Sequence, residues 1–443
     1  MKNSGIAFVI FNTYTKRFWG DIQTSLWSGF LKKKGIENDI LLVLLRPDNQ
    51  EANVGSINQL IKHCRTKKYK SVFLRSNYSS AITEKIKKEL NQEIYFLNPE
   101  GEKVLNSFLK NKIRDIRHYF YPSFKYKVFG LKNPGPPRMA AIYAFCCPYK
   151  KGLKENPYFR NIKQKEIKFW KGCSYCISAM NCGKEINQQE RDRTLEQNVK
   201  YLKVHLPTLK YIQIPFPGDS LGAIKNLVKE KNFRNVNFHV QFRSDTLAGE
   251  KEKIEEILNL MKKGNNAFFS SNIGFENFSP KELLLLNRGT SDKINLRALQ
   301  VFSYFKNNYP RNWITEETTA SFILFNPFTT IQDIKINLSY FLKFKNYFEM
   351  FKTLNFNKLK IPQDTPIYFL AKKENLLVVK NSLENVKTSC GGYVSDFVDY
   401  KFKDPRIESL YKNYEDLLYL NNEFRGNLVG KPIDCLVKAL NSL

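Results

Sequence analysis

The sequence predicts an α/β protein: an N-terminal doubly wound parallel sheet, then a partial (β/α)6 barrel, then a small, mostly helical C-terminal region. Three observations support this fold class. Apolar runs of strand length alternate with amphipathic helical stretches from residue 5 to about 100, and a second alternation starts at 139. The proline-rich segment 133–137 separates them, because no helix can continue through it. With 443 residues, the chain is long enough for two or three domains.

The first array supplies the doubly wound sheet. Its strands are continuous apolar runs, as expected of parallel strands covered on both faces. Ligands of such sheets bind beyond the carboxyl ends of the strands, where this chain carries Asn12, Arg75 and Asn98. The expected strands are 6–11, 39–45, 71–74 and 93–97, and the expected helices are 22–33, 56–68, 81–90 and 101–112.

The second array supplies the barrel, whose chemistry is expected at the carboxyl ends of its strands. The expected strands are 139–145, 211–215, 236–242, 267–273, 321–325 and 367–370. The expected helices are 187–203, 219–231, 250–263, 280–286, 292–307 and 330–347, with a further helix at 407–421. We therefore predict domains at 1–136, 137–371 and 372–443.

The charge balance is strongly basic. Lys and Arg number 71 against 42 Asp and Glu, which gives a net charge of +29. This excess favours an anionic partner, although lysines scattered over solvated faces would give the same count. No nucleic-acid-binding motif is visible. The apolar run 6–11 is too short to span a membrane, so a soluble, cytoplasmic protein is expected.

The cysteines are clustered. Of the eight in the chain, five lie between 146 and 182: Cys146, Cys147, Cys173, Cys176 and Cys182. A C-x-x-C pair such as Cys173 and Cys176 suits zinc, a redox pair or part of an iron–sulfur site. Because Cys147 follows the first strand of the second array, three thiolates are expected where a barrel places its cofactor.

These cysteines resemble the ligand loop of the radical S-adenosylmethionine (SAM) superfamily. That loop reads C-x3-C-x-aromatic-C, and both of its flanks are present as Cys147-Pro148-Tyr149 and Gly172-Cys173-Ser174-Tyr175-Cys176. Residues 148–172 intervene, which is a departure from the family's spacing. The resemblance implies a 4Fe–4S cluster held by Cys147, Cys173 and Cys176, with one iron open to SAM.

Two alternatives concern the ligand set. Cys146 is adjacent to the first ligand and is otherwise a buried strand residue. Cys182 is a loop thiol or an extra ligand, and a structural zinc at 147, 173, 176 and 182 is the rival to the cluster.

The downstream chain also resembles radical SAM enzymes of the cobalamin-dependent type. By that resemblance Glu276 and Ser279 lie near SAM, Gly218 and Asp219 near its amino group, and Asn326 near its adenine; Arg243 would bind its carboxylate. Each position also has a structural interpretation. Ser279 and Asp219 would cap helices, Arg243 would pair with Asp245, and Asn326 would precede an N-capped helix.

The N-terminal array resembles a cobalamin-binding domain in architecture alone. The D-x-H-x-x-G motif is absent, and His63 and His118 suit ordinary roles. Cobalamin without an axial histidine remains an expected second cofactor, with an empty structural domain as the alternative.

The expected function is therefore radical SAM chemistry, as a cobalamin-dependent methyltransferase. The unidentified substrate is expected to be anionic, a peptide or a natural product, and an external donor of flavodoxin or ferredoxin type would supply electrons. The alternatives are a cobalamin-independent enzyme acting on a peptide or RNA, and a non-catalytic zinc or iron–sulfur scaffold.

Overall fold

The computed structural model describes residues 4–13, 19–45, 50–75, 86, 88–90, 92–96, 126–129, 139–141, 149, 151–162, 167, 170–176, 188–205, 209–214, 220–378, 397–422 and 431–443. The chain divides into two compact units. The first comprises Met1–Ala144, Arg193–Gln213 and Asn385–Val394, and the second comprises Phe145–Asp192, Ile214–Glu384 and Ser395–Leu443. A mixed α/β chain with parallel sheets, as predicted, is confirmed.

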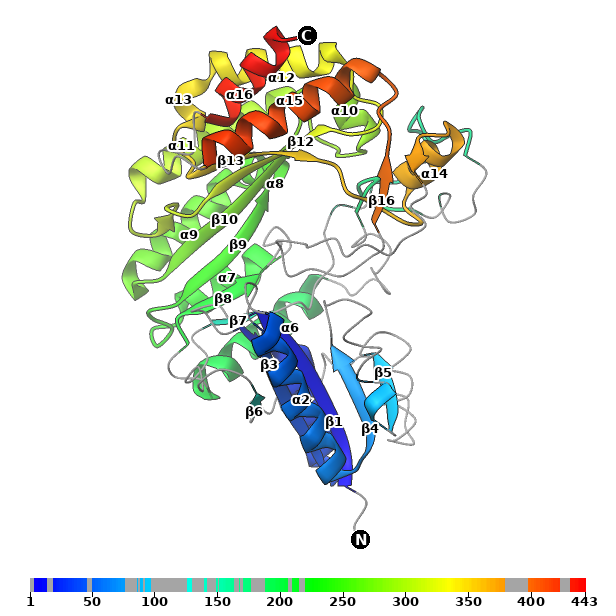
Figure 1. Ribbon diagram of the computed structural model, residues 1–443. Helices are drawn as coiled ribbons and strands as arrows, with labels where there is room; N and C mark the ends of the chain where they lie inside the picture. The colour runs from blue at the N-terminus through cyan, green and yellow to red at the C-terminus, as the bar shows by residue number, and fades with distance from the viewer. Residues whose placement is uncertain are drawn as a thin grey trace. The chain divides into compact units, whose positions relative to one another are not determined.

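A five-stranded parallel sheet forms the centre of the first unit (Figure 1). Its order is β5-β4-β1-β3-β6, so the chain passes from β1 to one neighbour and then crosses back to the other. The first four strands follow the flavodoxin-like order, but the fifth described strand pairs with β3 instead of extending the β5 edge. The strands are β1 (Ser4–Thr13), β3 (Asn38–Leu45), β4 (Tyr69–Arg75), β5 (Glu93–Phe96) and β6 (Tyr126–Phe129).

Helices α1 (Ile22–Lys33) and α2 (Gln50–Lys67) belong to the same unit. Leu60 and Cys64 of α2 are fully buried in one hydrophobic cluster with Val9, Leu41 and Val72 of the sheet. Burial of these apolar side chains fixes which face of α2 meets the strands.

Three short parallel strands also fall in the first unit. β7 (Met139–Ala141) pairs with β2 (Trp19–Asp21) and with β8 (Tyr211–Ile214), of which Ile214 belongs to the second unit. Helix α6 (Gln188–His205) precedes β8 and buries Leu195, Val199 and Leu202.

The second unit contains four long parallel strands in chain order (Figure 1). β9 (Asn237–Arg243), β10 (Ala267–Glu276), β12 (Thr319–Phe325) and β13 (Thr353–Lys358) each pair with the next, and β11 (Trp313–Ile314) pairs with β10. Helices connect them: α7 (Leu221–Lys229), α8 (Ser244–Gly249), α9 (Lys251–Gly264), α10 (Pro280–Leu285), α11 (Asp292–Asn308), α12 (Ile331–Lys343) and α13 (Lys345–Phe348).

One predicted strand is wrong. Residues 367–370 lie in helix α14 (Pro366–Lys373), which starts with proline at its first position. The parallel strand after β12 is instead β13, where the buried Leu354 and Phe356 alternate with exposed residues. An apolar run of four residues therefore indicated the wrong element, and a weaker alternation marked the real strand.

The described part of the C-terminal region is mostly helical, in agreement with the prediction. Helices α15 (Pro405–Asn422) and α16 (Lys431–Asn441) pack together, and α16 also contacts α12 and β13. A small antiparallel sheet joins β14 (Ile361–Pro362), β16 (Phe397–Tyr400) and β15 (Leu377–Val378).

Lys358, the last residue of β13, ties this region to the sheet. Its ammonium lies 4.8 Å from the ring centroid of Tyr400, 5.4 Å from that of Phe402 and 5.3 Å from that of Tyr411. It also lies 3.4 Å from the Asp399 carboxylate. Aromatic faces and one carboxylate thus hold the cation in place.

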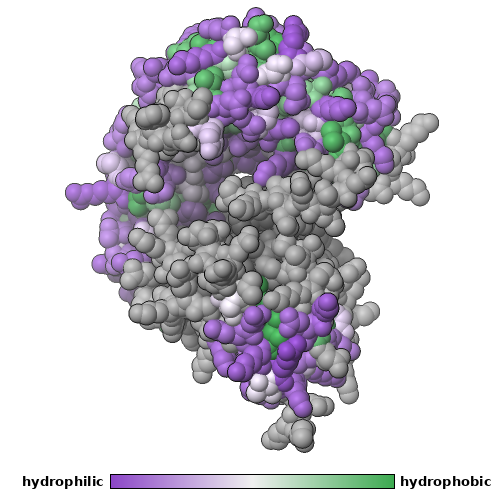
Figure 2. Space-filling model, viewed as in Figure 1, coloured by the Kyte–Doolittle hydropathy of each residue, from purple (hydrophilic) through white to green (hydrophobic). Residues whose placement is uncertain are grey.

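Among the described residues, no helix is both long and apolar enough to cross a membrane. Hydrophilic side chains dominate the described part of the face seen in Figure 2, and apolar ones occur in small groups. Exposed large apolar residues such as Val204 and Tyr419 are scattered over different helices, which is ordinary for a protein surface.

Candidate functional site

The long segment between the predicted cysteine ligands contains an excursion whose ends meet. The Gly172 amide donates to the Lys151 carbonyl at 3.0 Å, and Gly152 and Lys171 form an antiparallel bridge. Gly172 has φ 127°, a conformation that favours glycine. The excursion therefore begins at residue 151 and ends at residue 172, which lies beside residue 151 and directly precedes Cys173.

The C-x-x-C turn that follows is anchored to the segment after α10. The Ser174 amide donates to the Leu286 carbonyl at 3.0 Å, and the Ser174 hydroxyl donates to the Leu285 carbonyl at 2.9 Å. The Asn287 side chain donates to the Gly172 carbonyl at 2.7 Å. Because these partners follow the carboxyl end of β10, the turn is held at that edge of the sheet.

Cys173 lies buried between two guanidinium groups. Its sulfur accepts from Arg243 Nη1 at 3.6 Å and from Arg288 Nη1 at 3.8 Å. The amide of Cys176 donates to the Cys173 carbonyl at 3.3 Å, which closes the turn between the two cysteines. Two permanently charged guanidinium groups therefore each direct one N–H group at this sulfur.

Arg243, the last residue of β9, is held on three sides. Its Nε and Nη2 donate to the two carboxylate oxygens of Asp245, both at 2.9 Å, and Nη2 also donates to the Arg288 carbonyl at 2.8 Å. Its guanidinium carbon lies 4.3 Å from the ring centroid of Tyr149. The Arg243–Asp245 pair considered from the sequence is therefore present.

Arg288 is held from the end of β10. Its Nη2 donates to the Gly274 carbonyl at 2.9 Å and lies 3.4 Å from the Glu276 carboxylate. Glu276 thus contacts Arg288, which in turn contacts Cys173. The structure brings three predicted residues together around Arg288: Cys173, Arg243 and Glu276.

The backbone around Glu276 adopts a left-handed conformation. Glu276 has φ 66°, and the β10–β12 register shifts between Gly274 and Glu276. Bulges of this kind redirect a side chain at a strand end, and left-handed non-glycine residues concentrate at functional sites. A Cβ on Gly274 would lie 2.7 Å from Glu276 Oε1, so glycine allows the carboxylate to approach.

Gly289 fixes the position of Tyr149 in a similar way. It has φ 70°, and a Cβ there would overlap the Tyr149 ring. Tyr149 therefore lies against the Gly289 backbone on one side and the Arg243 guanidinium on another.

Two buried polar atoms of this cluster have no hydrogen-bond partner among the described residues: the Tyr149 hydroxyl and Arg288 Nε. Burial and the nearby Cys173 raise the pKa of Tyr149. Burial and Glu276 raise the pKa of Tyr175 well above its ordinary value. Both phenols therefore stay neutral, and the cluster offers unused donors to a further group.

A second polar cluster lies between α10 and α12. The Ser279 hydroxyl donates to Asp333 Oδ1 at 2.7 Å, while Lys281 and the Thr330 hydroxyl donate to Asp333 Oδ2 at 2.7 and 2.6 Å. Ser279 is the N-cap of α10, with Pro280 at the first position, and Thr330 forms a capping box with Asp333 in α12. The N-capped helix expected after Asn326 is therefore present, whereas Ser279 stands at the N-cap position of α10 without a capping hydrogen bond from its side chain.

Asn326 and Glu282 complete this second cluster. The Asn326 side-chain amide donates to Glu282 Oε2, and Lys281 Nζ lies 3.9 Å from Oε1. Burial and the Asp333 carboxylate raise the pKa of Glu282 to about 8. Glu282 therefore carries a proton at neutral pH.

The other predicted ligands lie outside the described residues: Cys147, Gly218 and Asp219, with the alternative ligands Cys146 and Cys182. Within the described part of the chain, no three His, Cys, Asp or Glu side chains group as metal ligands. Cys173 and Cys176 account for two of the three predicted thiolates.

Arg288 and Tyr149 were not among the predicted site residues. Tyr149 follows Cys147 in the predicted ligand loop, and Arg288 lies in the sequence Asn287-Arg288-Gly289, twelve residues after the predicted Glu276. Their importance depends on tertiary contacts with Cys173 and Arg243, which residue spacing does not encode.

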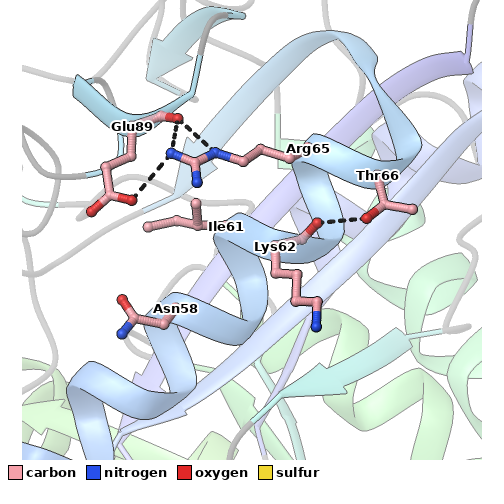
Figure 3. Close-up of a pocket in the computed structure, with 6 residues that line it drawn as sticks. All are labelled: Asn58, Ile61, Lys62, Arg65, Thr66 and Glu89. Carbon is pink, nitrogen blue, oxygen red and sulfur yellow. Dashed lines mark hydrogen bonds and ion pairs between the residues drawn. The ribbon is translucent and has the colours of Figure 1, made fainter.

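A separate groove of about 490 Å³ lies on α2 of the first unit (Figure 3). The residues lining it are Asn58, Ile61, Lys62, Arg65, Thr66 and Glu89. The guanidinium of Arg65 already has a partner in this groove, because its Nη2 and Nε donate to the Glu89 carbonyl at 2.7 and 3.0 Å. The groove holds none of the predicted site residues.

No known family model matches the chain, and no curated protein matches it. Among solved structures, a glycosyltransferase from Rickettsia africae ESF-5 is similar over 85% of this chain and 88% of that one, with 10% identity and a TM-score of 0.19. A TM-score of this size carries no argument, so function has to be inferred from the residues themselves.

Proposed function

We propose that this chain is a radical SAM enzyme that holds a 4Fe–4S cluster through Cys147, Cys173 and Cys176. One observation carries the proposal: the excursion after Cys147 has both ends hydrogen-bonded, at Lys151 and Gly172. Its residues therefore add length without separating the two ends. The segment between Cys147 and Cys173 is longer in sequence than in the family, but the pairing of its ends shortens the distance that it spans.

The residues around Cys173 fit a cluster of this kind. Thiolate-bound iron–sulfur clusters carry negative charge, and hydrogen bonds to their sulfurs stabilise them. Arg243 and Arg288 direct N–H groups at the Cys173 sulfur. A structural zinc site needs four protein ligands. Three cysteines leave one coordination position open for a ligand from outside the protein, such as SAM.

The carboxyl ends of β9, β10 and β12 carry the other residues proposed for SAM. Arg243 and Glu276 end their strands, and Asn326 follows β12 directly. The consecutive order of β9, β10, β12 and β13 also suits a partial barrel, which places its chemistry at this edge. Together, the cluster and SAM would supply a one-electron cleavage of the SAM sulfonium bond.

The described side chains would bind and orient these groups. Asp245 fixes the plane of Arg243, and Glu276 with the Gly274 carbonyl fixes Arg288, so both cations are positioned before any ligand arrives. Arg243 and Glu276 are proposed to contact the charged end of SAM. Tyr149 lies against the buried Arg243 guanidinium.

Methyl transfer with cobalamin is the reaction class we propose for the enzyme. In the first-unit sheet the strand order reverses at β1, because the next two strands of the sheet along the chain, β3 and β4, lie on opposite sides of it. Ligands of such sheets bind at this point, beyond the carboxyl ends of the strands. His63 contacts Tyr69 at 3.1 Å, at the amino end of β4, and so is not the axial ligand at that edge. The residues after β1 and β4 that would hold the corrin lie outside the described part of the chain.

The test is anaerobic reconstitution with iron and sulfide, followed by reduction in the presence of SAM. We expect about four irons per chain and formation of 5′-deoxyadenosine, both lost when Cys147, Cys173 and Cys176 are changed together to alanine. A matched control changes Cys64 and Cys435, buried in α2 and α16, to alanine and should keep both.

The outcomes separate the alternatives. S-adenosylhomocysteine that depends on added methylcobalamin would support the methyltransferase, and 5′-deoxyadenosine alone would favour a cobalamin-independent enzyme. Full iron content in the triple variant, or zinc without 5′-deoxyadenosine in the unmutated protein, would contradict the proposal.

A further inference from the structure

The other contacts of Arg243 and Arg288 hold both side chains in place beside Cys173. Asp245 and the Arg288 carbonyl take Nε and Nη2 of Arg243, and the Gly274 carbonyl and Glu276 take Nη2 of Arg288. In each guanidinium, Nη1 points at the same sulfur, and among the described residues Nε of Arg288 has no hydrogen-bond partner. Neither side chain can turn away without breaking a buried hydrogen bond, which is costly.

The charges around this sulfur are unevenly exposed. Arg243 and Arg288 are only 4% and 5% exposed, while the side chains of their acidic partners Asp245 and Glu276 are 27% and 13% exposed. Water screens the two carboxylates more than the two cations, so the buried side of the cluster is positive. Cys173 lies on that positive side.

We infer that Arg243 and Arg288 raise the reduction potential of the cluster by stabilising its reduced form through the Cys173 sulfur. This inference rests on the function proposed above. In the step concerned, one electron passes from an external one-electron donor to the oxidised cluster. No bond to the protein forms or breaks and no proton moves, so the cluster gains one negative charge, part of which falls on its sulfurs. N–H groups and positive charge at a cluster sulfur favour that form.

The consequence is an easier electron transfer from the donor. A cluster with a raised potential accepts the electron from a weaker reductant. In this effect on the potential, Arg243 and Arg288 act through Cys173 and are positioning residues; the contact proposed between Arg243 and SAM is a separate role.

The test measures the midpoint potential of the reconstituted cluster by an EPR-monitored redox titration with dithionite as the reductant. We expect Arg288→Gln to lower the ratio of reduced to oxidised cluster at a fixed potential about tenfold, which is about 59 mV for one electron. Arg288→Lys and Arg243→Lys keep a charge without the planar fork and should shift the potential less, in the same direction.

A variant with the opposite sign guards against misfolding. Asp245→Asn removes a partly exposed negative charge and leaves Arg243 less neutralised, so the potential should rise. Loss of structure cannot produce shifts of opposite sign. Arg406→Lys is the control, because Arg406 makes the same two-point contact with Asp404, at 3.0 and 2.8 Å, on an exposed surface. It should leave the potential unchanged.

Each result decides between the two proposals. Unchanged potentials in the Arg288 and Asp245 variants, at full iron content, would overturn the arginine inference and leave the proposed function standing. A wild-type protein that assembles no cluster would overturn both.

Discussion

Two polar networks occupy opposite ends of parallel strands, one in each unit. In the first unit, Lys127 donates to His63 Nδ1 at 3.1 Å, His63 Nε2 lies 3.1 Å from the Tyr69 hydroxyl, and Tyr69 donates to Asp39 at 2.6 Å. Asp39, Tyr69 and Lys127 stand at the amino ends of β3, β4 and β6. In the second unit, the network around Arg288 stands at the carboxyl ends of β9 and β10.

The difference between them lies in how their hydrogen bonds and charges are satisfied. The first-unit network runs from one cation to one carboxylate through two neutral groups. The second-unit network contains two buried cations, a left-handed Glu276, and unpartnered atoms on Tyr149 and Arg288. Such features cost stability, so they are not expected in a network that only stabilises the fold. They are expected where strand ends bind a ligand. Substitutions in the first-unit network should therefore change stability alone.

The largest effect is expected at Glu282, in the second polar cluster of the second unit. Its pKa of about 8 lies above the ordinary 4.5, so the folded state holds a proton that the unfolded state has released. Stability is then lost as pH rises from about 4.5 through 8. Glu282→Gln removes this loss, and its benefit at pH 9 relative to pH 5 should be on the order of 3–5 kcal/mol in urea unfolding, at about 1.4 kcal/mol per pKa unit.

A surface glutamate provides the control for this change. Glu250 lies 3.5 Å from Lys253, and both side chains are exposed. Glu250→Gln should alter stability by less than about 1 kcal/mol at either pH. Equal effects of Glu282→Gln at pH 5 and pH 9 would mean that the carboxyl is ionised throughout.

Two glycines with nearly the same backbone angle sharpen the comparison between the units. Gly289 has φ 70° and lies under Tyr149, while Gly35 has φ 72° and open space around it. Gly35→Ala should cost only the backbone strain, about 1–2 kcal/mol. Gly289→Ala should cost about 1–2 kcal/mol more, because the methyl group must displace the Tyr149 ring.

The readouts are urea unfolding and the iron content after reconstitution. Gly289→Ala should lower both stability and iron content, and Gly35→Ala stability alone. Equal costs for the two variants would show that Tyr149 moves away freely.

Much of the architecture could be predicted from the sequence, because periodicity is a local signal. The helix predicted at 22–33 has those bounds, and the helix predicted at 292–307 is one residue longer. The predicted strand at 367–370 is wrong because an apolar run of that length suits a strand or a helix equally, and Pro366 starts a helix.

The site was predictable only in part. Motif positions put Arg243 and Glu276 at strand ends, where the structure has them. The pairing of Gly152 with Lys171 and the contact of Arg288 with Cys173 join segments far apart in sequence. Neither has a periodic pattern, so residue spacing could not reveal them.

The smallest effect is expected at His63, in the first-unit network. Burial and the Lys127 ammonium lower its pKa below 6.5, so below that pH the unfolded state takes up a proton that the folded state resists. Stability should therefore fall as pH decreases from about 6.5 towards the lowered value. Urea unfolding at pH 5.5 and 7.5 should show this fall in the wild type and a smaller one in His63→Gln. Lys127→Met, which removes the cation, should also reduce the fall, and neither variant should change the midpoint potential of the cluster. A changed potential would mean that this network does more than stabilise the first unit.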